Sequence, residues 1–558
     1  MVNGCPLEYV TKDVLAALVA SHQPPRIFVR GGALVTVRSD ENDRAIIAQV
    51  GENQLRHEIA RACRCKRTIA DPGAKHVPPP LDVVRDLAAA PAWPFPPIVG
   101  ITAGPMIRAD GSVCMDEGDD DRLRTLYVKP RDLHVPPIPE SPTREDAIAA
   151  VKFIDDAIGE FPFSAEPDRA NAIALLATPA LRQFITGCVP FALIDAPAAG
   201  TGKSLFGNVV ATVTTGRPAS LMLAPRDDDE WRKRITAALC EGALVINVDN
   251  IEWPLGTPSL AAALTACEWN DRALGTNSMV RVQQRSTWPG TGNNIRLRGD
   301  MPRRCYRIRL DPKVARPWQR TGFRHADLIQ WVSRHRGELL AALLTLARAW
   351  IVAGKPAPAV RPLGSFESWT VTVGGVLEYA GVRGFLANLD DMYAQSDDDS
   401  PQWAAFLGAW SDLWGPTPKT VAAIADEIQS ENRTLREVVP DELGDMLKRP
   451  ESFRRRLGLA LRRRVDTRYG DDRLHIRRGD DRHARVAEWS VEAAEVAGSA
   501  GSWGSNPVPT HGKSESSAQE ERMELGGKQP PAPRTPCNEP GECGRPRQKR
   551  PPPQSGLF

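Results

Sequence analysis

The chain has 558 residues, which is too long for one compact core, so we expect roughly two to four domains. Hydrophobic residues make up 42% of the sequence and charged residues 25%, which is the composition of a globular protein that can bury real cores. The formal net charge of +2 argues against a wholly basic protein that coats nucleic acid, although charge can still be concentrated in one domain.

The sequence carries no pattern of a secretory signal or of a membrane span. Asn3, Pro6 and Glu8 interrupt the first ten residues, and no apolar run approaches the length of about 18 residues that a span needs. The ten cysteines and nine histidines show no spacing typical of zinc ligands. We therefore expect a soluble, cytoplasmic protein with reduced thiols and no membrane partner.

The first 187 residues predict two regions. Residues 26–38 place β-branched residues around Gly31-Gly32, which is typical of a hairpin, and we expect a small mixed α/β domain over 1–80. Proline-rich stretches near residues 78–80 and 91–97 mark a boundary. Residues 81–187 then predict strands and turns, followed from residue 144 by helices in which apolar residues recur at three- and four-residue steps.

Residues 188–315 alternate apolar, strand-like runs with helical stretches, which predicts an α/β fold with a parallel sheet. Within this region, Phe191–Asp195 leads through a glycine-rich turn into a helix, the local structure that a phosphate-binding loop (P-loop) requires. Such a turn lets backbone amides surround phosphates, and the helix N-terminus adds positive charge. The predicted ATP-binding residues are Ala198, Ala199, Gly200, Thr201, Gly202, Lys203 and Ser204.

Two of these side chains have distinct predicted roles. Lys203 would reach the β and γ phosphates of ATP, and Ser204 would bind Mg²⁺. The match to the general pattern is incomplete, because Pro197 stands five residues before Gly202 where glycine is usual. The alternative interpretation is a glycine-rich helix start with an exposed lysine.

A carboxylate follows the next strongly apolar strand. Asp249 ends the run Ala243–Val248, and a residue in this position typically holds the metal through water, so Asp249 is a second predicted Mg²⁺ residue. Its neighbour is Asn250 rather than the usual glutamate, which leaves the base that activates water open, with Glu252 as a candidate. The alternative is an ordinary strand end followed by a polar turn.

Two later segments complete the predicted catalytic set. Thr287–Asn294 runs from a strand into a turn, and Asn293 or Asn294 would orient the attacking water. Arg303 and Arg304 precede another apolar strand and suit an arginine finger that acts across a subunit boundary. Surface ion pairs with nearby aspartates are the alternative for these arginines.

The remaining sequence predicts three further parts. Residues 316–400 are helical and would form a lid region, and residues 496–558, rich in Gly, Ser and Pro, predict a disordered tail. Residues 401–495 predict a winged helix-turn-helix, with helices near 418–428 and 453–465 and a hairpin wing over 468–478. Residues 448–485 hold fourteen basic against six acidic residues, a formal charge of +8, which favours phosphate contacts with DNA over a solvated or protein-docking face.

Residues 188–312 resemble the AAA+-like ATPase core of phage, plasmid and integrative-element helicases, of the superfamily 3 or primase-helicase type. The segments that carry the resemblance are Val248–Ile251, Ser259–Ala266, Asp271–Gly275, and Thr291–Asn294 through Arg303-Arg304, with a weaker likeness at Gly100–Ser112. The resemblance implies the same roles for the residues named above. It also implies a hairpin over 275–285 that carries Arg281 and Arg285 to DNA phosphates; a plain surface hairpin is the alternative.

We therefore expect a DNA-dependent ATPase with ATP and Mg²⁺ as cofactors, acting as the helicase motor of a mobile genetic element in DNA replication. The resemblance implies a homo-oligomeric ring, with DNA and replication proteins as partners. One alternative is a nucleotide-gated DNA-binding or initiator protein with little hydrolysis, because Asn250 and Pro197 depart from the pattern. Another is a small-molecule P-loop kinase, against which the +8 segment argues.

Overall fold

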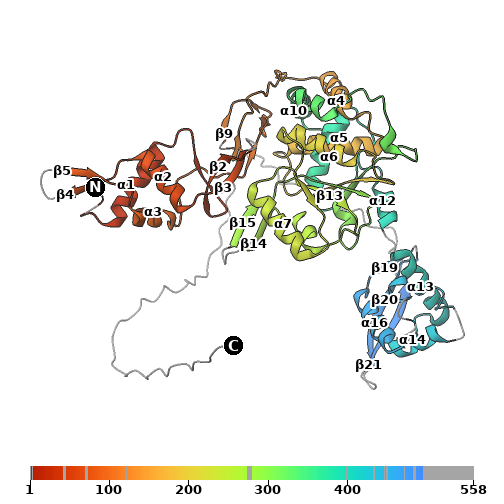
Figure 1. Ribbon diagram of the computed structural model, residues 1–558. Coiled ribbons are helices and arrows are strands. Elements are labelled where there is room, and N and C mark those ends of the chain that lie inside the picture. The colour runs from red at the N-terminus through yellow and green to blue at the C-terminus, as the bar shows by residue number, and fades with distance from the viewer. Residues whose placement is uncertain are drawn as a thin grey trace, which may run out of the picture. The chain divides into compact units, whose positions relative to one another are not determined.

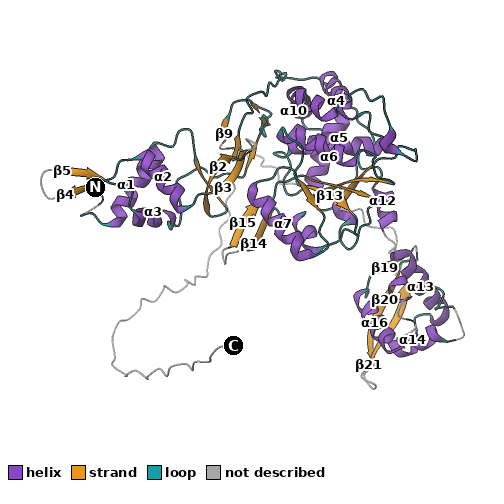
Figure 2. Ribbon diagram, viewed as in Figure 1, coloured by secondary structure: helices purple, strands orange, loops and turns teal. Residues whose placement is uncertain are grey.

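The computed structural model describes most of the chain up to residue 493 (Figure 1). The described residues are 2, 4–41, 45–69, 73–120, 122–272, 279–396, 399–430, 434–444, 447, 450–470, 472–481 and 486–493. The predicted disordered tail over 496–558 lies outside them. Helices and strands alternate throughout, as Figure 2 shows, so the predicted mixed α/β class is confirmed.

The N-terminal region combines short helices with small antiparallel sheets. Helices α1 (Leu7–Ala20), α2 (Glu52–Ala62) and α3 (Leu81–Ala88) pack around one apolar cluster. Strands β1 (Ile27–Arg30), β2 (Ala33–Ser39) and β3 (Ala45–Gln49) form one sheet, and β4 (Lys66–Ile69) and β5 (Gly73–His76) pair separately. The predicted hairpin is β1–β2, where Gly31 and Gly32 both have positive φ, as a tight two-residue turn requires.

Short strands and two long helices then lead to the central sheet. The strands are β6 (Gly100–Thr102), β7 (Met106–Ile107), β8 (Val113–Cys114), β9 (Gly118–Asp120) and β10 (Thr125–Tyr127). Helix α4 (Arg144–Ile158) starts with a capping box in which Thr143 and Asp146 satisfy each other's backbone amides. Helix α5 (Glu166–Leu181) follows and is buried along most of its length.

The central sheet consists of β11 (Phe191–Ala196), β12 (Leu221–Leu223), β13 (Asn247–Ile251), β16 (Trp288–Asn293) and β17 (Cys305–Arg309). The strand order is β12-β13-β16-β11-β17, and each neighbouring pair is parallel, which confirms the predicted parallel sheet. Every strand therefore ends at the same edge, which we call the carboxyl edge. Ligands of open α/β sheets usually bind there.

Helices cover both faces of this sheet. Successive residues of a strand point to opposite faces. On β11, Ala192 and Ile194 join a core with α5 and α6 (Lys203–Thr215), while Phe191 and Leu193 join a core with α7 (Asp228–Glu241) and α8 (Pro258–Ala263). All six residues of β11 are buried, which explains why the strand reads as a continuous apolar run rather than an alternating one.

The helices predicted over 316–400 are present. They are α9 (Leu328–Arg334), α10 (Arg336–Val352), α11 (Glu367–Tyr379) and α12 (Leu389–Ser396). Helices α10 and α11 contribute to the same core as α4, α5 and α6, and Figure 1 shows α10 grouped with those helices. These two helices are therefore part of the core, and a lid function for the region stays a prediction.

Two sequence-based boundaries need correction. Strand β13 runs to Ile251 and does not end at Asp249, because Asn250 adopts φ 55° and shifts the pairing with β16 without ending it. The hairpin predicted over 275–285 begins earlier, since its strands are β14 (Glu268–Arg272) and β15 (Met279–Gln283). Its tip, residues 273–278, lies outside the described residues.

The C-terminal region has its own apolar core of Trp403, Phe406, Trp410 and their neighbours. Its helices are α13 (Asp399–Trp414), α14 (Val421–Gln429), α15 (Asp441–Gly444) and α16 (Pro450–Arg463). Its strands are β18 (Lys419–Thr420), β19 (Arg468–Tyr469), β20 (Leu474–Asp481) and β21 (Val486–Ala493), in the order β18-β21-β20-β19. The longer hairpin is β20–β21, so the wing predicted over 468–478 is only the short β19–β20 pair.

Candidate nucleotide-binding site

The glycine-rich turn between β11 and α6 has the backbone that an anion site needs. Gly200 and Gly202 have φ values of 74° and 96°, a region that residues with a side chain rarely adopt. Both glycines are also crowded, because an added Cβ would come within 3.2 Å of the Phe161 ring at Gly202 and 2.9 Å of the Trp318 Cβ at Gly200. No side chain caps the start of α6, so its first amides remain available to a ligand.

Lys203 extends across this turn. Its Nζ donates to the Ala198 carbonyl oxygen at 3.0 Å, to Thr201 Oγ1 at 3.2 Å and to Asn293 Oδ1 at 2.7 Å. Burial lowers the pKa of Lys203, while the charges of Asp195 and Asp249 act in the opposite direction. The ammonium group is thus held in the turn by neutral oxygens, which phosphate oxygens of higher charge could replace.

Ser204 and Asp249 meet at the carboxyl edge. The Ser204 hydroxyl donates to Asp249 Oδ1 at 2.9 Å, and the Thr291 hydroxyl donates to the same oxygen at 2.6 Å. A hydroxyl beside a carboxylate suits Mg²⁺, which takes few protein oxygens and keeps water and phosphate oxygens for the rest of its shell. Among the described residues, no group of three or more His, Cys, Asp or Glu side chains is arranged to hold a metal ion.

Asn250 turns the chain next to this carboxylate. Its backbone amide donates to Thr291 Oγ1 at 3.2 Å, and its side-chain amide donates to Glu252 Oε1 at 2.7 Å. The residue that replaces the usual glutamate therefore holds another glutamate two positions later. Glu252 is exposed, so its carboxylate is accessible to water.

The two predicted asparagines, Asn293 and Asn294, have different hydrogen-bond partners. Asn293 ends β16 and accepts from Lys203, whereas Asn294 Oδ1 accepts from Arg309 Nη2 at 2.9 Å. Arg309 also forms an ion pair with the buried Asp195, and the Ile295 amide donates to Asp195 Oδ1 at 3.1 Å. Of the two asparagines, Asn293 is the one in direct contact with the P-loop lysine.

Arg303 and Arg304 lie at the other edge of the sheet. Both directly precede β17, whose first residue Cys305 pairs with Phe191 at the start of β11, while the P-loop follows the end of β11. Arg303 has a side chain that is 62% exposed and pairs with Asp300 at 2.9 Å. Arg304 is only 13% exposed, pairs with Asp300 at 3.0 Å, and donates to Thr265 Oγ1 at 2.8 Å and to the Ala261 carbonyl. Neither arginine can reach the P-loop of its own chain.

Sequence reasoning missed the polar residues that support this site. Thr291 could have been found, because it lies two positions before Asn293 and so points to the same side of β16. Asp195 and Arg309 gave no such signal, since they come from separate strands and meet only in the sheet. Asp168 gave none either: burial raises its pKa, and it accepts from the Arg309 amide at 2.9 Å and from Asn388 at 2.8 Å.

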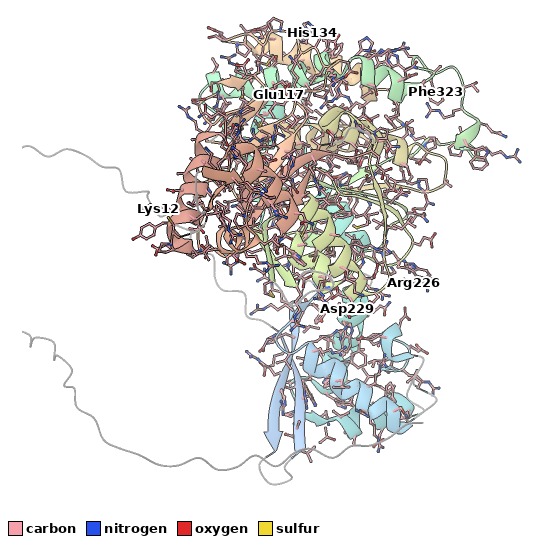
Figure 3. The ribbon with its side chains drawn as sticks, turned by 60° about the vertical axis from the view of Figure 1, so that its left-hand side comes forward. Lys12, Glu117, His134, Arg226, Asp229 and Phe323 are labelled. Atoms are coloured by element: carbon pink, nitrogen blue, oxygen red, sulfur yellow. The ribbon has the colours of Figure 1, made fainter. Side chains whose placement is uncertain are left out.

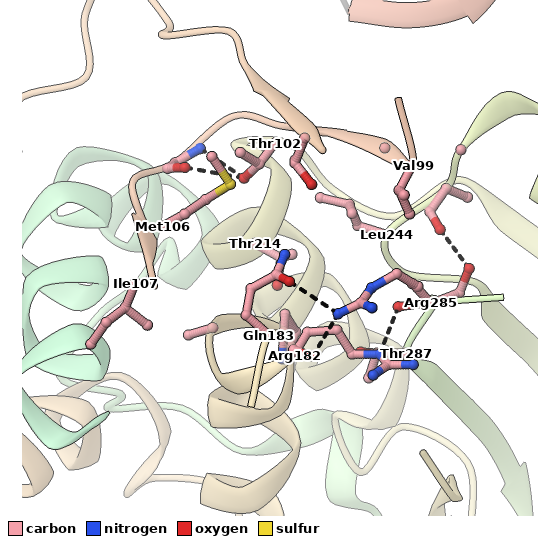
Figure 4. A pocket seen from close by; sticks show the side chains of 18 of the residues that line it. Val99, Thr102, Met106, Ile107, Arg182, Gln183, Thr214, Leu244, Arg285 and Thr287 are labelled. Carbon is pink, nitrogen blue, oxygen red and sulfur yellow. Dashed lines mark hydrogen bonds between the residues drawn. The ribbon is translucent and has the colours of Figure 1, made fainter. Parts of the chain in front are cut away.

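A separate cavity of about 110 Å³ is lined by Thr287, which directly precedes β16, and by Val99 and Met106 (Figure 4). Three arginines, Arg30, Arg182 and Arg285, also line it. Arg182 donates to the carbonyl oxygens of Ile185 and Gly187 at 2.9 and 2.6 Å, and burial lowers its pKa to about 10. Arg285 donates to the Arg182 carbonyl at 2.7 Å. Arg285 therefore faces this cavity, which contradicts its predicted contact with DNA phosphates.

These arginines have a structural explanation. Arg182 holds carbonyls just after α5, and Arg30 holds the last carbonyls of α7 at Leu239 and Cys240. In the same way, Arg336 donates to Thr212 and Val213 at the end of α6 at 3.1 and 3.0 Å, and burial lowers its pKa to about 10. A cation at a helix C-terminus satisfies the free carbonyls and the negative end of the dipole, so these buried charges need no carboxylate.

Solved structures that resemble this chain at low sequence identity include three described below. No protein-family model matches the sequence, and a search of the curated proteins finds no match. The apo NrS-1 C-terminal region (A form) matches with 11% identity and a TM-score of 0.35, covering 86% of this chain and 98% of that one. SCCmec type IV Cch, an active helicase, matches with 12% identity and a TM-score of 0.31, covering 73% and 78%. JCV helicase matches with 13% identity and a TM-score of 0.19, covering 46% and 72%.

Two of these three neighbours are helicases by name. Among the described residues, no helix combines the length and apolar character needed to cross a membrane.

Proposed function

We propose that this protein binds ATP with Mg²⁺ and hydrolyses it, as a DNA-dependent ATPase that serves as the helicase motor of a mobile genetic element. One observation supports this most: at the carboxyl edge, Lys203 at the start of α6 donates a hydrogen bond to Asn293 at the end of β16, and the adjacent Ser204 donates one to Asp249 in β13. A glycine-rich helix start with a solvent-exposed lysine would not need these partners. A cytoplasmic location and replication proteins as partners belong to the same proposal.

In this proposal each residue acts on a defined part of the nucleotide. The amides of residues 198–204 surround the phosphates, and Lys203 exchanges its neutral partners for the β and γ phosphate oxygens. Ser204 and Asp249 would hold Mg²⁺, which when bound neutralises charge on the phosphates. Asn293 orients the attacking water, and Glu252 accepts its proton, since Asn250 cannot.

The arginine finger is proposed to act between subunits of a ring. Arg303 is the better candidate of the two arginines, because its side chain is 62% exposed and its one ion-pair partner among the described residues is Asp300. Arg304 is 13% exposed and is committed to contacts within its own chain. An exposed guanidinium at the edge opposite the P-loop could reach the nucleotide of a neighbouring copy, where it would stabilise transition-state charge.

DNA contacts are proposed for the basic C-terminal region and for the β14–β15 hairpin. The order of helices and strands from α13 to β21 supports the proposal of a winged helix-turn-helix, in which α16 would be the recognition helix. On the hairpin, the Arg281 side chain is 69% exposed and lies 3.3 Å from Glu268. Phosphate oxygens could compete with that exposed carboxylate, because surface ion pairs contribute little.

A second candidate function is a nucleotide-gated DNA-binding or initiator protein with little hydrolysis. The observation that favours it is Asn250, which occupies the usual position of the catalytic glutamate and ties up Glu252 by a hydrogen bond of 2.7 Å. If that bond persists when ATP is bound, water would lack a base and ATP would stay intact.

The test is the rate of ATP hydrolysis with and without single-stranded DNA, for the wild-type protein and for Lys203→Ala. We expect hydrolysis that DNA stimulates and that Lys203→Ala abolishes, with an unchanged melting temperature. ATP binding without turnover in the wild-type protein would favour the initiator. Wild-type turnover in Lys203→Ala would refute the site itself.

A further inference from the structure

The segment after β17, residues 311–325, runs beside the P-loop. The Asp311 amide donates to the Pro162 carbonyl at 2.7 Å, and the Arg324 amide donates to the Glu160 carboxylate at 2.9 Å. Arg324 also forms an ion pair with Asp156. Both ends of the segment are thus tied to the α4–α5 connection, and Figure 3 labels Phe323 near its far end.

The middle of this segment contacts the P-loop directly. An added Cβ on Gly200 would lie 2.9 Å from the Trp318 Cβ, 3.2 Å from its Cε3 and 3.3 Å from its backbone nitrogen. Trp318 nevertheless remains 61% exposed, whereas the preceding Pro317 is buried and fixes the backbone. Trp318 therefore presents an indole ring that is open to solvent directly beside the glycine-rich turn.

The order of strands shows which end of a nucleotide would lie here. Asp249 and Asn293 are the residues proposed to act on the metal and the terminal phosphate; Asp249 lies in β13 and Asn293 at the end of β16, both on one side of β11. Trp318 follows β17, which lies on the other side of β11. A nucleotide whose terminal phosphate points toward β16 must therefore extend its sugar and base toward β17.

The segment also has the charge of a nucleotide contact. Residues 311–325 contain four basic residues, Lys313, Arg316, Arg320 and Arg324, and one acidic residue, Asp311. Arg320 lies over the Phe323 ring at 5.1 Å, and no ion pair is described for Lys313 or Arg316. The wall around Trp318 is therefore basic as well as aromatic, which suits a nucleoside triphosphate.

We propose that Trp318 is the base-binding wall of the nucleotide site and that the base of the bound nucleoside triphosphate stacks on its indole ring. This inference rests on the proposed nucleotide site and adds which residue recognises the base. Stacking uses a face that every base has, so Trp318 would supply affinity for nucleosides as a class, with selection among bases coming from other contacts.

The experiment measures the affinity of the full chain for Mg-ATP and for Mg-tripolyphosphate, which has the phosphates without the base, by calorimetry. We expect Trp318→Ala to weaken ATP binding by about 5- to 100-fold, the usual range for one lost base–aromatic stack. Tripolyphosphate binding should stay as in the wild-type protein, and Trp318→Phe should retain most of the ATP affinity.

Two further variants make the result decisive. Phe323→Ala removes an aromatic ring that is 42% exposed in the same segment, and should leave ATP affinity unchanged. Lys203→Ala should weaken the binding of both Mg-ATP and Mg-tripolyphosphate. If it weakens the binding of neither ligand, the proposed nucleotide site is wrong. If Lys203→Ala behaves as expected but Trp318→Ala leaves ATP affinity unchanged, or weakens both ligands equally, Trp318 does not bind the base.

Discussion

Helix α16 offers a quantitative test of DNA binding. The buried Phe453 and Leu457 fix the rotation of the helix, and as a result Arg455 and Arg456 are exposed. Arg454 differs from them because it donates to Asp426 at 2.7 Å. The sequence suggests three equivalent arginines over 454–456, but only two of them point freely outward. We expect Arg455→Ala/Arg456→Ala to weaken DNA binding and to lower its dependence on salt.

The size of the effect follows from counterion release. Each phosphate contact contributes about 0.9 to the slope of log affinity against log salt on duplex DNA, and about 0.7 on a single strand. Two lost contacts should therefore lower the slope by about 1.8 or about 1.4. On duplex DNA, the ratio of wild-type to variant affinity would shrink about 12-fold between 50 and 200 mM salt.

The assay is a DNA-binding titration at several salt concentrations, with a control of equal charge. Arg454→Ala/Arg477→Ala also removes two positive charges, but from side chains in ion pairs with Asp426, Asp466 and Glu492. We expect a slope close to the wild-type value for this control. Equal losses in both variants would mean that only net charge matters, and no loss in either would mean that α16 faces solvent or a protein partner.

Three further predictions concern the P-loop site. Glu252→Gln should slow ATP hydrolysis by about 10²- to 10⁴-fold without weakening ATP binding, if the carboxylate is the base; wild-type turnover would exclude it. Mixing Arg303→Ala with Lys203→Ala should restore some hydrolysis at mixed interfaces, and inactive mixtures of variants that still oligomerise would refute a finger in trans. Burial lowers the pKa of Lys203, so this side chain loses its positive charge at a lower pH than an ordinary lysine does. ATP affinity should therefore fall as the pH rises toward the pKa of Lys203. Lys203→Arg, which keeps its charge, should bind ATP without that dependence, and an equal fall in both would assign the titration to another group.

The parts of the fold that are determined by residues close together in the sequence could be predicted. The proposed P-loop is one continuous segment of strand, turn and helix, so its composition predicts both its backbone and its place after β11. The parallel sheet follows from the alternation of apolar strands and helices. Helix α16 was placed within a few residues, because Phe453, Leu457 and Leu461 recur at helical spacing.

Features that join distant parts of the chain could not be predicted in this way. The resemblance predicts that a hairpin carries Arg285 to DNA phosphates, but its guanidinium turns inward to the Arg182 carbonyl, more than a hundred residues earlier in the chain. Arg303 and Arg304 are neighbours of the same type, yet one is exposed and the other is held by Ala261 and Thr265. In both cases tertiary packing decides whether the arginine is exposed or buried in contacts within the chain. The local sequence pattern is the same for an exposed and for a buried arginine.

Parallel strands separate the proposed steps of the reaction in space. Because β11 lies between β16 and β17, hydrolytic groups such as Asn293 and a base-binding group such as Trp318 can act on opposite ends of one nucleotide without contact between them. Because Arg303 stands at the start of β17, it cannot serve the same nucleotide and is available to a second copy of the chain. Binding, hydrolysis and coupling between subunits should therefore respond to different substitutions. A substitution at Trp318 should change affinity alone, one at Glu252 should change turnover alone, and one at Arg303 should matter only in the assembled oligomer.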